Sequence, residues 1–88
     1  MISFDYKPQG VCARNIHLDL SDDGNKVVGV EFTGGCDGNL KGVCALVTGM
    51  DAEQAAQRLE GIRCGFKNTS CPDQLSIALT EALAQEKQ

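Results

Sequence analysis

Three short segments in the first part of the chain alternate apolar and polar residues, which is the pattern of strands with one buried face. They are Ile2–Tyr6, Ile16–Leu20 and Val28–Phe32. Between the second and third segments lies Ser21–Asn25, whose Asp-Gly-Asn residues tolerate the positive φ of a tight hairpin turn. The pattern therefore predicts a three-stranded antiparallel meander.

The apolar spacing becomes helical after Gly34 and Gly35. A first helix is predicted to end near Gly49, and its apolar stripe is Leu40, Val43, Cys44, Val47 and Met50. A second helix should begin after Asp51, whose carboxylate is placed to accept from the Gln54 backbone N–H in a capping box, and should stop at Gly61. Its apolar stripe is Ala55, Ala56 and Leu59.

A third helix is predicted with Pro72 in its first turn and a frayed end over residues 85–88. Its apolar stripe is Leu75, Ala78, Leu79, Ala82 and Leu83. Strands that come first and helices that follow favour an α+β fold, in which the three helices pack on one face of the sheet. With 88 residues, 42% of them hydrophobic, the chain should form a single domain over residues 1–88.

The charge balance disfavours two classes of partner. Eight Lys and Arg against twelve Asp and Glu give a net charge of −4, which opposes non-specific binding to nucleic acid and to anionic membranes. No apolar run is long enough to span a bilayer, and the first residues lack the pattern of an export signal. We therefore expect a cytoplasmic protein that binds neither nucleic acid nor membrane.

Five cysteines are the unusual feature of the composition. Their odd number and the expected reducing compartment disfavour disulfides, so metal binding, redox chemistry or burial are the alternatives. Cys44 falls inside the apolar stripe of the first helix and is interpreted as core. Four thiols remain as candidates for a site, and they are Cys12, Cys36, Cys64 and Cys71.

These four cysteines are predicted in loops or at helix starts. Cys36 and Cys71 precede or begin helices, where unpaired N–H groups and the helix dipole favour a thiolate, although Ser70 is an alternative cap for the third helix. Cys12 is at the mouth of a strand, and a bend would bring Cys64 to Cys71. Four thiolates suffice for zinc or an iron–sulfur cluster, but the set contains no Cys-x-x-Cys pair, so spacing alone leaves metal and redox roles open.

The other candidate residues carry weaker signals. His17, the single histidine, alternates with Ile16 and Leu18 and is expected on the solvent face of its strand. The segment 22–25 is interpreted as a turn, because it lacks the further ligands of a calcium loop. The segment 34–38 lacks the Lys and Ser/Thr of a phosphate loop, and its Asp37 is kept as a minor ligand candidate.

The string Thr69–Asp73 reads Thr-Ser-Cys-Pro-Asp, and with it the chain resembles the TSCPD domain family. The segments Gly10–Cys12, Phe32–Leu40 and Gly61–Gly65 extend the resemblance to the small stand-alone branch with four cysteines. This resemblance implies Cys12, Cys36, Cys64 and Cys71 as a set, with Cys44 outside it. Because the domain also occurs at the C-terminus of adenosylcobalamin-dependent ribonucleotide reductases, it implies a link to deoxyribonucleotide synthesis. It does not imply reductase activity, since 88 residues cannot hold the catalytic barrel.

The chain is also similar, more faintly, to U-type iron–sulfur scaffold proteins in its order of strands and helices and in the positions of Cys12, Cys36 and Cys71. Two residues depart from that pattern: Arg14 replaces an aspartate, and Ser70 replaces a histidine. If Cys64 fills the vacant ligand position, the site is closed and made only of thiolates. Such a site suits structural zinc better than a cluster that must be handed on.

The leading hypothesis is therefore one metal, zinc in preference to an iron–sulfur cluster, bound by Cys12, Cys36, Cys64 and Cys71. A second hypothesis is a thiol–disulfide shuttle that uses Cys64 and Cys71. A third is an accessory module that docks on a ribonucleotide reductase or binds a nucleotide. These hypotheses leave enzymatic activity open: we expect none from the chain alone, although the resemblance could attach a ribonucleoside-diphosphate reductase label by association. A homodimer would suit so small a domain.

Overall fold

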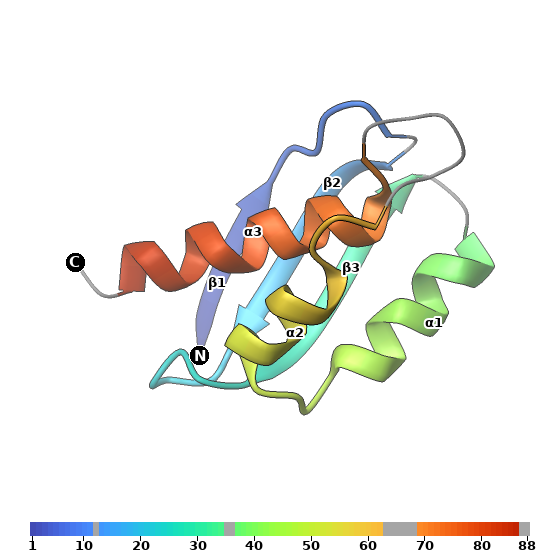
Figure 1. The fold of residues 1–88 in the computed structure, drawn as a ribbon. Helices are drawn as coiled ribbons and strands as arrows, with labels where there is room; N and C mark the ends of the chain where they lie inside the picture. Colours follow the sequence, from blue (N-terminus) through green and yellow to red (C-terminus); the bar gives the residue numbers. More distant parts are fainter. Residues whose placement is uncertain (12, 35–36, 63–68, 87–88) are drawn as a thin grey trace.

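The computed structural model of the chain describes residues 1–11, 13–34, 37–62 and 69–86. Three strands are followed by three helices, and this order confirms the predicted α+β fold (Figure 1). The elements are β1 (Ile2–Tyr6), β2 (Ala13–Leu20), β3 (Val27–Gly34), α1 (Asp37–Val47), α2 (Ala52–Leu59) and α3 (Cys71–Glu86). In the described part of the chain, no helix is both long and apolar enough to cross a membrane.

The strands form an antiparallel sheet in the order β1-β2-β3, as the alternating pattern predicts. Strands β2 and β3 are longer than the predicted segments, and their pairing contains two irregularities. One leaves Arg14 unpaired between Ala13 and Asn15, and the other leaves Val28 unpaired in β3. A bulge shifts the alternation of side chains by one residue, so Ala13 and Ile16 both face the core although they are an odd number of residues apart.

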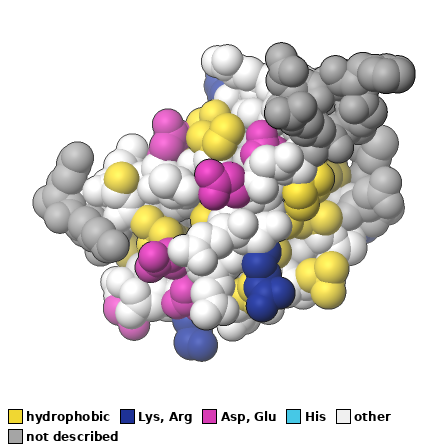
Figure 2. Space-filling view, in the orientation of Figure 1, with side chains coloured by type: hydrophobic (Ala, Val, Ile, Leu, Met, Phe, Trp, Pro, Cys, Tyr) yellow, Lys and Arg dark blue, Asp and Glu magenta, His cyan; other side chains and the backbone are white. Residues whose placement is uncertain are grey.

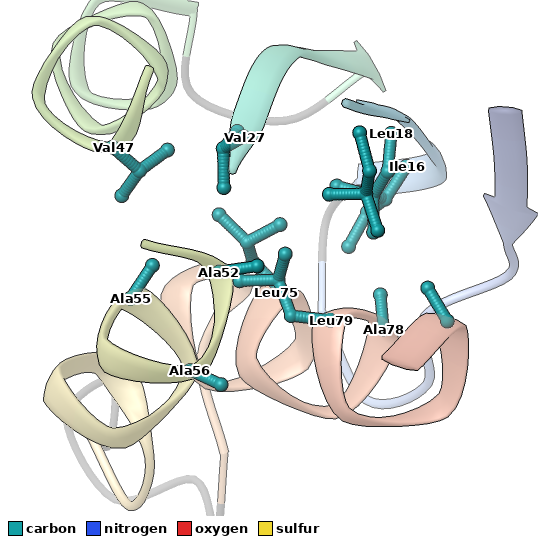
Figure 3. Packing of buried hydrophobic residues seen from close by; sticks show 12 residues of the cluster. Ile16, Leu18, Val27, Val47, Ala52, Ala55, Ala56, Leu75, Ala78 and Leu79 are labelled. Atoms are coloured by element: carbon teal, nitrogen blue, oxygen red, sulfur yellow. The ribbon is translucent and has the colours of Figure 1, made fainter. Parts of the chain in front are cut away.

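The core lies between the sheet and α3, with α2 packed against α3 (Figure 3). Leu75 and Leu79 on α3 are fully buried, as are Ile16 and Leu18 on β2. The buried face of α2 consists of alanines, Ala52, Ala55 and Ala56. The side chain of alanine ends at Cβ, so this face allows α2 to approach its neighbours closely.

Helix α1 lies along β3, and its connection to α2 is hydrogen-bonded to the start of that strand. The Gly49 N–H donates to the Val27 carbonyl at 2.7 Å, and the Val27 N–H donates to the Met50 carbonyl at 2.9 Å. Gly49 has φ +90°, which suits glycine at a helix end. The Gln54 N–H donates to the Asp51 carboxylate at 3.1 Å, so the predicted N-cap of α2 is confirmed.

Cys44 differs from its interpretation as a core residue. It is half-buried and lines a small groove between α1 and β3, together with Phe32 and Leu40. Burial raises the pKa of its thiol. The apolar stripe of α1 is only partly covered because this helix lies beside β3, while α2 and α3 cover the face of the sheet.

The outer face of the sheet is polar and includes His17, as predicted from its alternation with Ile16 and Leu18. The His17 Nδ1 lies 2.9 Å from the Asp5 carboxylate, and its Nε2 lies 3.1 Å from the Asp19 carboxylate. Only the imidazolium form can donate from both nitrogens at once. The hydrogen bond to Asp5 is accordingly the main cause of a raised pKa for His17, and the same bond lowers the pKa of Asp5.

This arrangement predicts a pH-dependent contribution to stability. A His17 pKa raised above 6.5 stabilises the fold fully below that pH, and this contribution is lost as the pH rises through the folded-state value. The lowered Asp5 pKa gives a contribution that is present above pH 3.8 and lost in acid. Urea unfolding of wild type and His17→Gln should therefore differ more at about pH 5 than at about pH 8.5. An equal difference at both pH values would contradict this account.

The packing of α3 predicts a large effect of truncation in the core. Leu79 is 0% exposed, so Leu79→Ala should lower the free energy of unfolding by about 2–5 kcal/mol. Leu46 on α1 is 77% exposed, and Leu46→Ala, which removes the same atoms, should cost less than about 0.5 kcal/mol. Chemical denaturation of the two variants checks this, and similar losses would contradict the observed core.

Candidate functional site

The structure describes one member of the predicted cysteine set. Cys71 is the first residue of α3, and its thiol is free and half-buried. Cys12, Cys36 and Cys64 lie outside the described residues, but residues on either side of each of them are described. Within residues 1–11, 13–34, 37–62 and 69–86, no group of three His, Cys, Asp or Glu side chains is placed to hold a metal ion.

Ser70 is the N-cap of α3, which was the alternative cap predicted from the sequence. Its Oγ accepts from the Asp73 N–H at 3.1 Å and donates to the Ile62 carbonyl at 2.6 Å. Ser70 is buried, with 4% of its surface exposed, so both bonds are shielded from water. Capping by Ser70 places Cys71 in the first turn of α3, next to the cap.

Asp73 joins the two described ends of the segment that contains Cys64. Its carboxylate accepts from the Gly61 N–H at 2.7 Å and from the Thr69 hydroxyl at 2.5 Å. Gly61 has φ +81°, a conformation that favours glycine. Together with the bond from Ser70 to Ile62, these contacts hold the chain on both sides of residues 63–68 against the first turn of α3.

Gln74 makes the equivalent connection to the loop that leads to Cys12. Its Oε1 accepts from the Gln9 N–H at 3.0 Å, and its Nε2 donates to the Thr69 hydroxyl at 3.0 Å. Gly10 has φ +73°, and a Cβ at this position would lie 3.4 Å from the Thr69 Cγ2. The loop between β1 and β2 therefore rests directly on the start of α3.

The pairing of β2 with β3 brings the neighbours of Cys12 and Cys36 to the same end of the sheet. Ala13, next to Cys12, is paired with Gly34, two residues before Cys36. Figure 1 shows the start of β2, the end of β3 and the start of α3 at this end of the molecule. Described residues near Cys12 and Cys64 thus bond to the start of α3 beside Cys71, and the chain near Cys36 is paired with β2 at the same end of the sheet.

The weaker candidates lie elsewhere. Cys44 lines the groove between α1 and β3, and His17 is held by two carboxylates on the outer face of the sheet. The segment 21–25 is a turn, as predicted, because the Asp23 carboxylate accepts from the Asn25 N–H at 2.9 Å and Gly24 has φ +75°. Asp37 begins α1, and its side chain lies outside the described part of the structure.

Two features of this end were missed in the sequence analysis. The first is the role of Gln74 in connecting two loops to α3. Its position next to the apolar stripe of α3 could have indicated this role, because a polar side chain that is buried there needs hydrogen-bond partners. Gln74 is only 5% exposed. The bulge at Arg14 is the other, and the odd spacing of two buried residues, Ala13 and Ile16, was its signal.

The fold and this set of hydrogen bonds define a small α+β domain in which the polar residues of one helix start organise the adjoining loops. The chain belongs to the TSCPD domain family, whose model matches residues 4–83. The match covers most of the chain and includes the string Thr69–Asp73. No curated protein and no solved structure matches the chain.

The two bonds of Ser70 predict an effect beyond that of an ordinary cap. Ser70→Ala removes the cap and leaves the Ile62 carbonyl without its donor, so it should lower the free energy of unfolding by about 1–3 kcal/mol. Asp51→Ala removes the exposed cap of α2 and should cost about 1 kcal/mol or less. Urea denaturation compares them, and a larger loss in Asp51→Ala would refute the role given to Ser70.

Proposed function

We propose that the domain binds one zinc ion through Cys12, Cys36, Cys64 and Cys71. The observation that supports this is the set of hydrogen bonds from Ser70, Asp73 and Gln74, which tie the chain beside Cys12 and Cys64 to the helix that begins with Cys71. The pairing of Ala13 with Gly34 adds the chain beside Cys36. A set of hydrogen bonds that gathers four cysteine-bearing segments is what a four-ligand site requires.

The donor set fits zinc. Four thiolates satisfy the tetrahedral coordination that structural zinc prefers, with no position left for water or substrate. Cys71, in the first turn of α3, is the described member of the set, and each thiol gives up its proton when it binds the metal. Zinc would supply cross-linking rather than a reaction, and an iron–sulfur cluster on the same thiolates is the second choice of cofactor.

The core gives a reason for such a cross-link. Among the described residues, the core cluster has twelve members, and five of them are alanines. Alanine contributes little apolar area, and domains of this size often need a metal or another covalent or coordinate staple. The bound metal would therefore add stability at the end of the sheet that the small core does not itself cover.

The cellular role that we propose is that of an accessory module. The family's association with ribonucleotide reductases supports a partner among these enzymes and a link to deoxyribonucleotide synthesis, with the chain itself not an enzyme. In this role the zinc site maintains the fold, and a surface of the domain binds the partner protein. We expect an immobilised ribonucleotide reductase to retain the folded domain. This retention should be lost after zinc is removed.

The fifth cysteine provides a matched control for the metal site. Elemental analysis of untagged protein purified without oxygen should find one zinc per chain in wild type and in Cys44→Ser. Cys71→Ser should lose most of the metal and unfold more easily, because three thiolates leave the coordination incomplete. Zinc removal by a chelator should destabilise wild type in the same way.

Two outcomes would overturn this proposal. Folded wild-type protein without metal, in which Cys64 and Cys71 oxidise readily to a disulfide, would favour the thiol–disulfide shuttle instead. Equal loss of zinc from Cys71→Ser and Cys44→Ser would show that the four-cysteine set is wrong. Iron, sulfide and visible absorption would keep the ligands and replace zinc by a cluster.

A further inference from the structure

A groove of about 640 Å³ lies between α2 and α3, on their side away from the sheet. One wall is a face of α2 that includes Glu53 and Ala56, and it is continued by Glu60, the residue that caps the end of α2. The other wall is a single face of α3 that includes Ile77, Glu81 and Ala84, with half-buried Leu83 beside them. Each wall follows the i, i+3, i+4, i+7 spacing of one helical face.

The groove is apolar at its base and acidic at its border. Ile77, an apolar residue of the α3 wall, is 37% exposed although it lines the groove between the two helices. Glu53, Glu60 and Glu81 are exposed, and none of the described residues that line the groove is a lysine or an arginine. Figure 2, which views the molecule with α2 and α3 toward the reader, shows several acidic side chains among apolar ones on this face, together with a basic side chain near its centre.

The helix α3 itself adds to the negative potential. Its sequence contains acidic residues and no Lys or Arg, and its last turn has no basic residue to offset the negative end of the helix dipole. The Ala84 end of the groove lies next to that helix end. The whole chain has a net charge of −4, so the field at longer range has the same sign.

We propose that this groove binds a basic amphipathic helix of a partner protein. The groove walls extend over about eight residues of each helix, or about 12 Å, which matches two turns of a third helix packed alongside. Apolar side chains of that helix cover Ile77, Leu83 and Ala56. Glu53 and Glu60 are seven residues apart, so basic side chains seven positions apart on the partner helix, about 10.5 Å, face them both.

Charge complementarity selects this occupant over others. A second copy of the chain would present another acidic surface to the groove, and no long basic segment occurs in the sequence. An anionic lipid surface or a nucleic acid would meet the same repulsion. A helix with both apolar and basic residues satisfies the base and the border of the groove together.

The experiment uses the full chain with its metal and a fluorescein-labelled helical peptide of about 18 residues, made of leucine, alanine and lysine with lysines seven positions apart. A second peptide, with glutamate in place of lysine, tests the charge. Fluorescence anisotropy should show binding of the lysine peptide that weakens when salt is raised to about 0.5 M. The glutamate peptide should not bind.

Two pairs of variants locate the binding site. Glu60→Lys should weaken binding of the lysine peptide at least about fivefold, whereas Glu31→Lys, an equal change in net charge at an exposed residue of β3, should change it less than about twofold. Ile77→Ser should weaken binding, whereas Leu46→Ser on α1 should not. Circular dichroism and zinc content of each variant confirm that the fold and the metal are retained, which separates this test from that of the metal site.

Several results would overturn the proposal. Absence of binding would do so, as would equal binding of the glutamate peptide. If Glu60→Lys and Glu31→Lys weakened peptide binding equally, the peptide would be attracted by the net charge of the protein and not by the groove. Self-association of wild type that Ile77→Ser abolishes, measured by sedimentation, would assign the groove to a second copy of the chain instead.

Discussion

The buried hydrogen bonds at the start of α3 constrain much of the molecule, because polar side chains that are shielded from water must find partners nearby. Ser70 and Gln74 are almost fully buried, and their partners are the backbone of Ile62 and Gln9. Each bond therefore fixes the position of a loop as well as satisfying a side chain. The described residues Gln9 and Ile62 are thereby held against the start of α3.

Helix α3 connects this polar cluster to the apolar core. Leu75 follows directly after Gln74 and is fully buried against the sheet, so the helix cannot move without disturbing both. Two loops and the core thus share one rigid element. The small size of the core, in which alanines are frequent, explains why a cross-link at this end would add substantially to stability.

The opposite side of α3 has a different character. Ile77 and Glu81 face outward, away from the residues that contact the sheet. The helix therefore divides into a first turn that organises the loops, an inner face that forms the core and an outer face with α2 that remains open. This division fits the proposed role of the domain as a module in which metal binding maintains a surface that a partner recognises.

The sequence alone predicted the parts of the fold that depend on local patterns. Alternation predicted the three strands and the outward position of His17, and a capping box predicted the start of α2 at Asp51. Ser70, the cap of α3, was predicted only as the alternative to Cys71. Cys44 was wrongly interpreted as core, because helical spacing shows which residues share a face but not how fully a neighbour covers that face.

Other features depend on contacts between distant parts of the chain. The bulge at Arg14 depends on the pairing of β2 with β3, and the bond from Gln74 to Gln9 joins residues 65 positions apart. The odd spacing of Ala13 and Ile16 and the polar Gln74 beside an apolar stripe mark both features in the sequence, but a local pattern does not identify the distant partners. The four-cysteine set came from loop positions and from the family string, and the structure adds the hydrogen bonds that bring their neighbours together.

The central claim is that these hydrogen bonds assemble an all-thiolate zinc site around Cys71. X-ray absorption at the zinc edge, on protein purified without added metal, tests it most directly. The account predicts a first shell of about four sulfur atoms at about 2.3 Å. A first shell that contains nitrogen or oxygen ligands, or protein that folds fully without zinc, would contradict it.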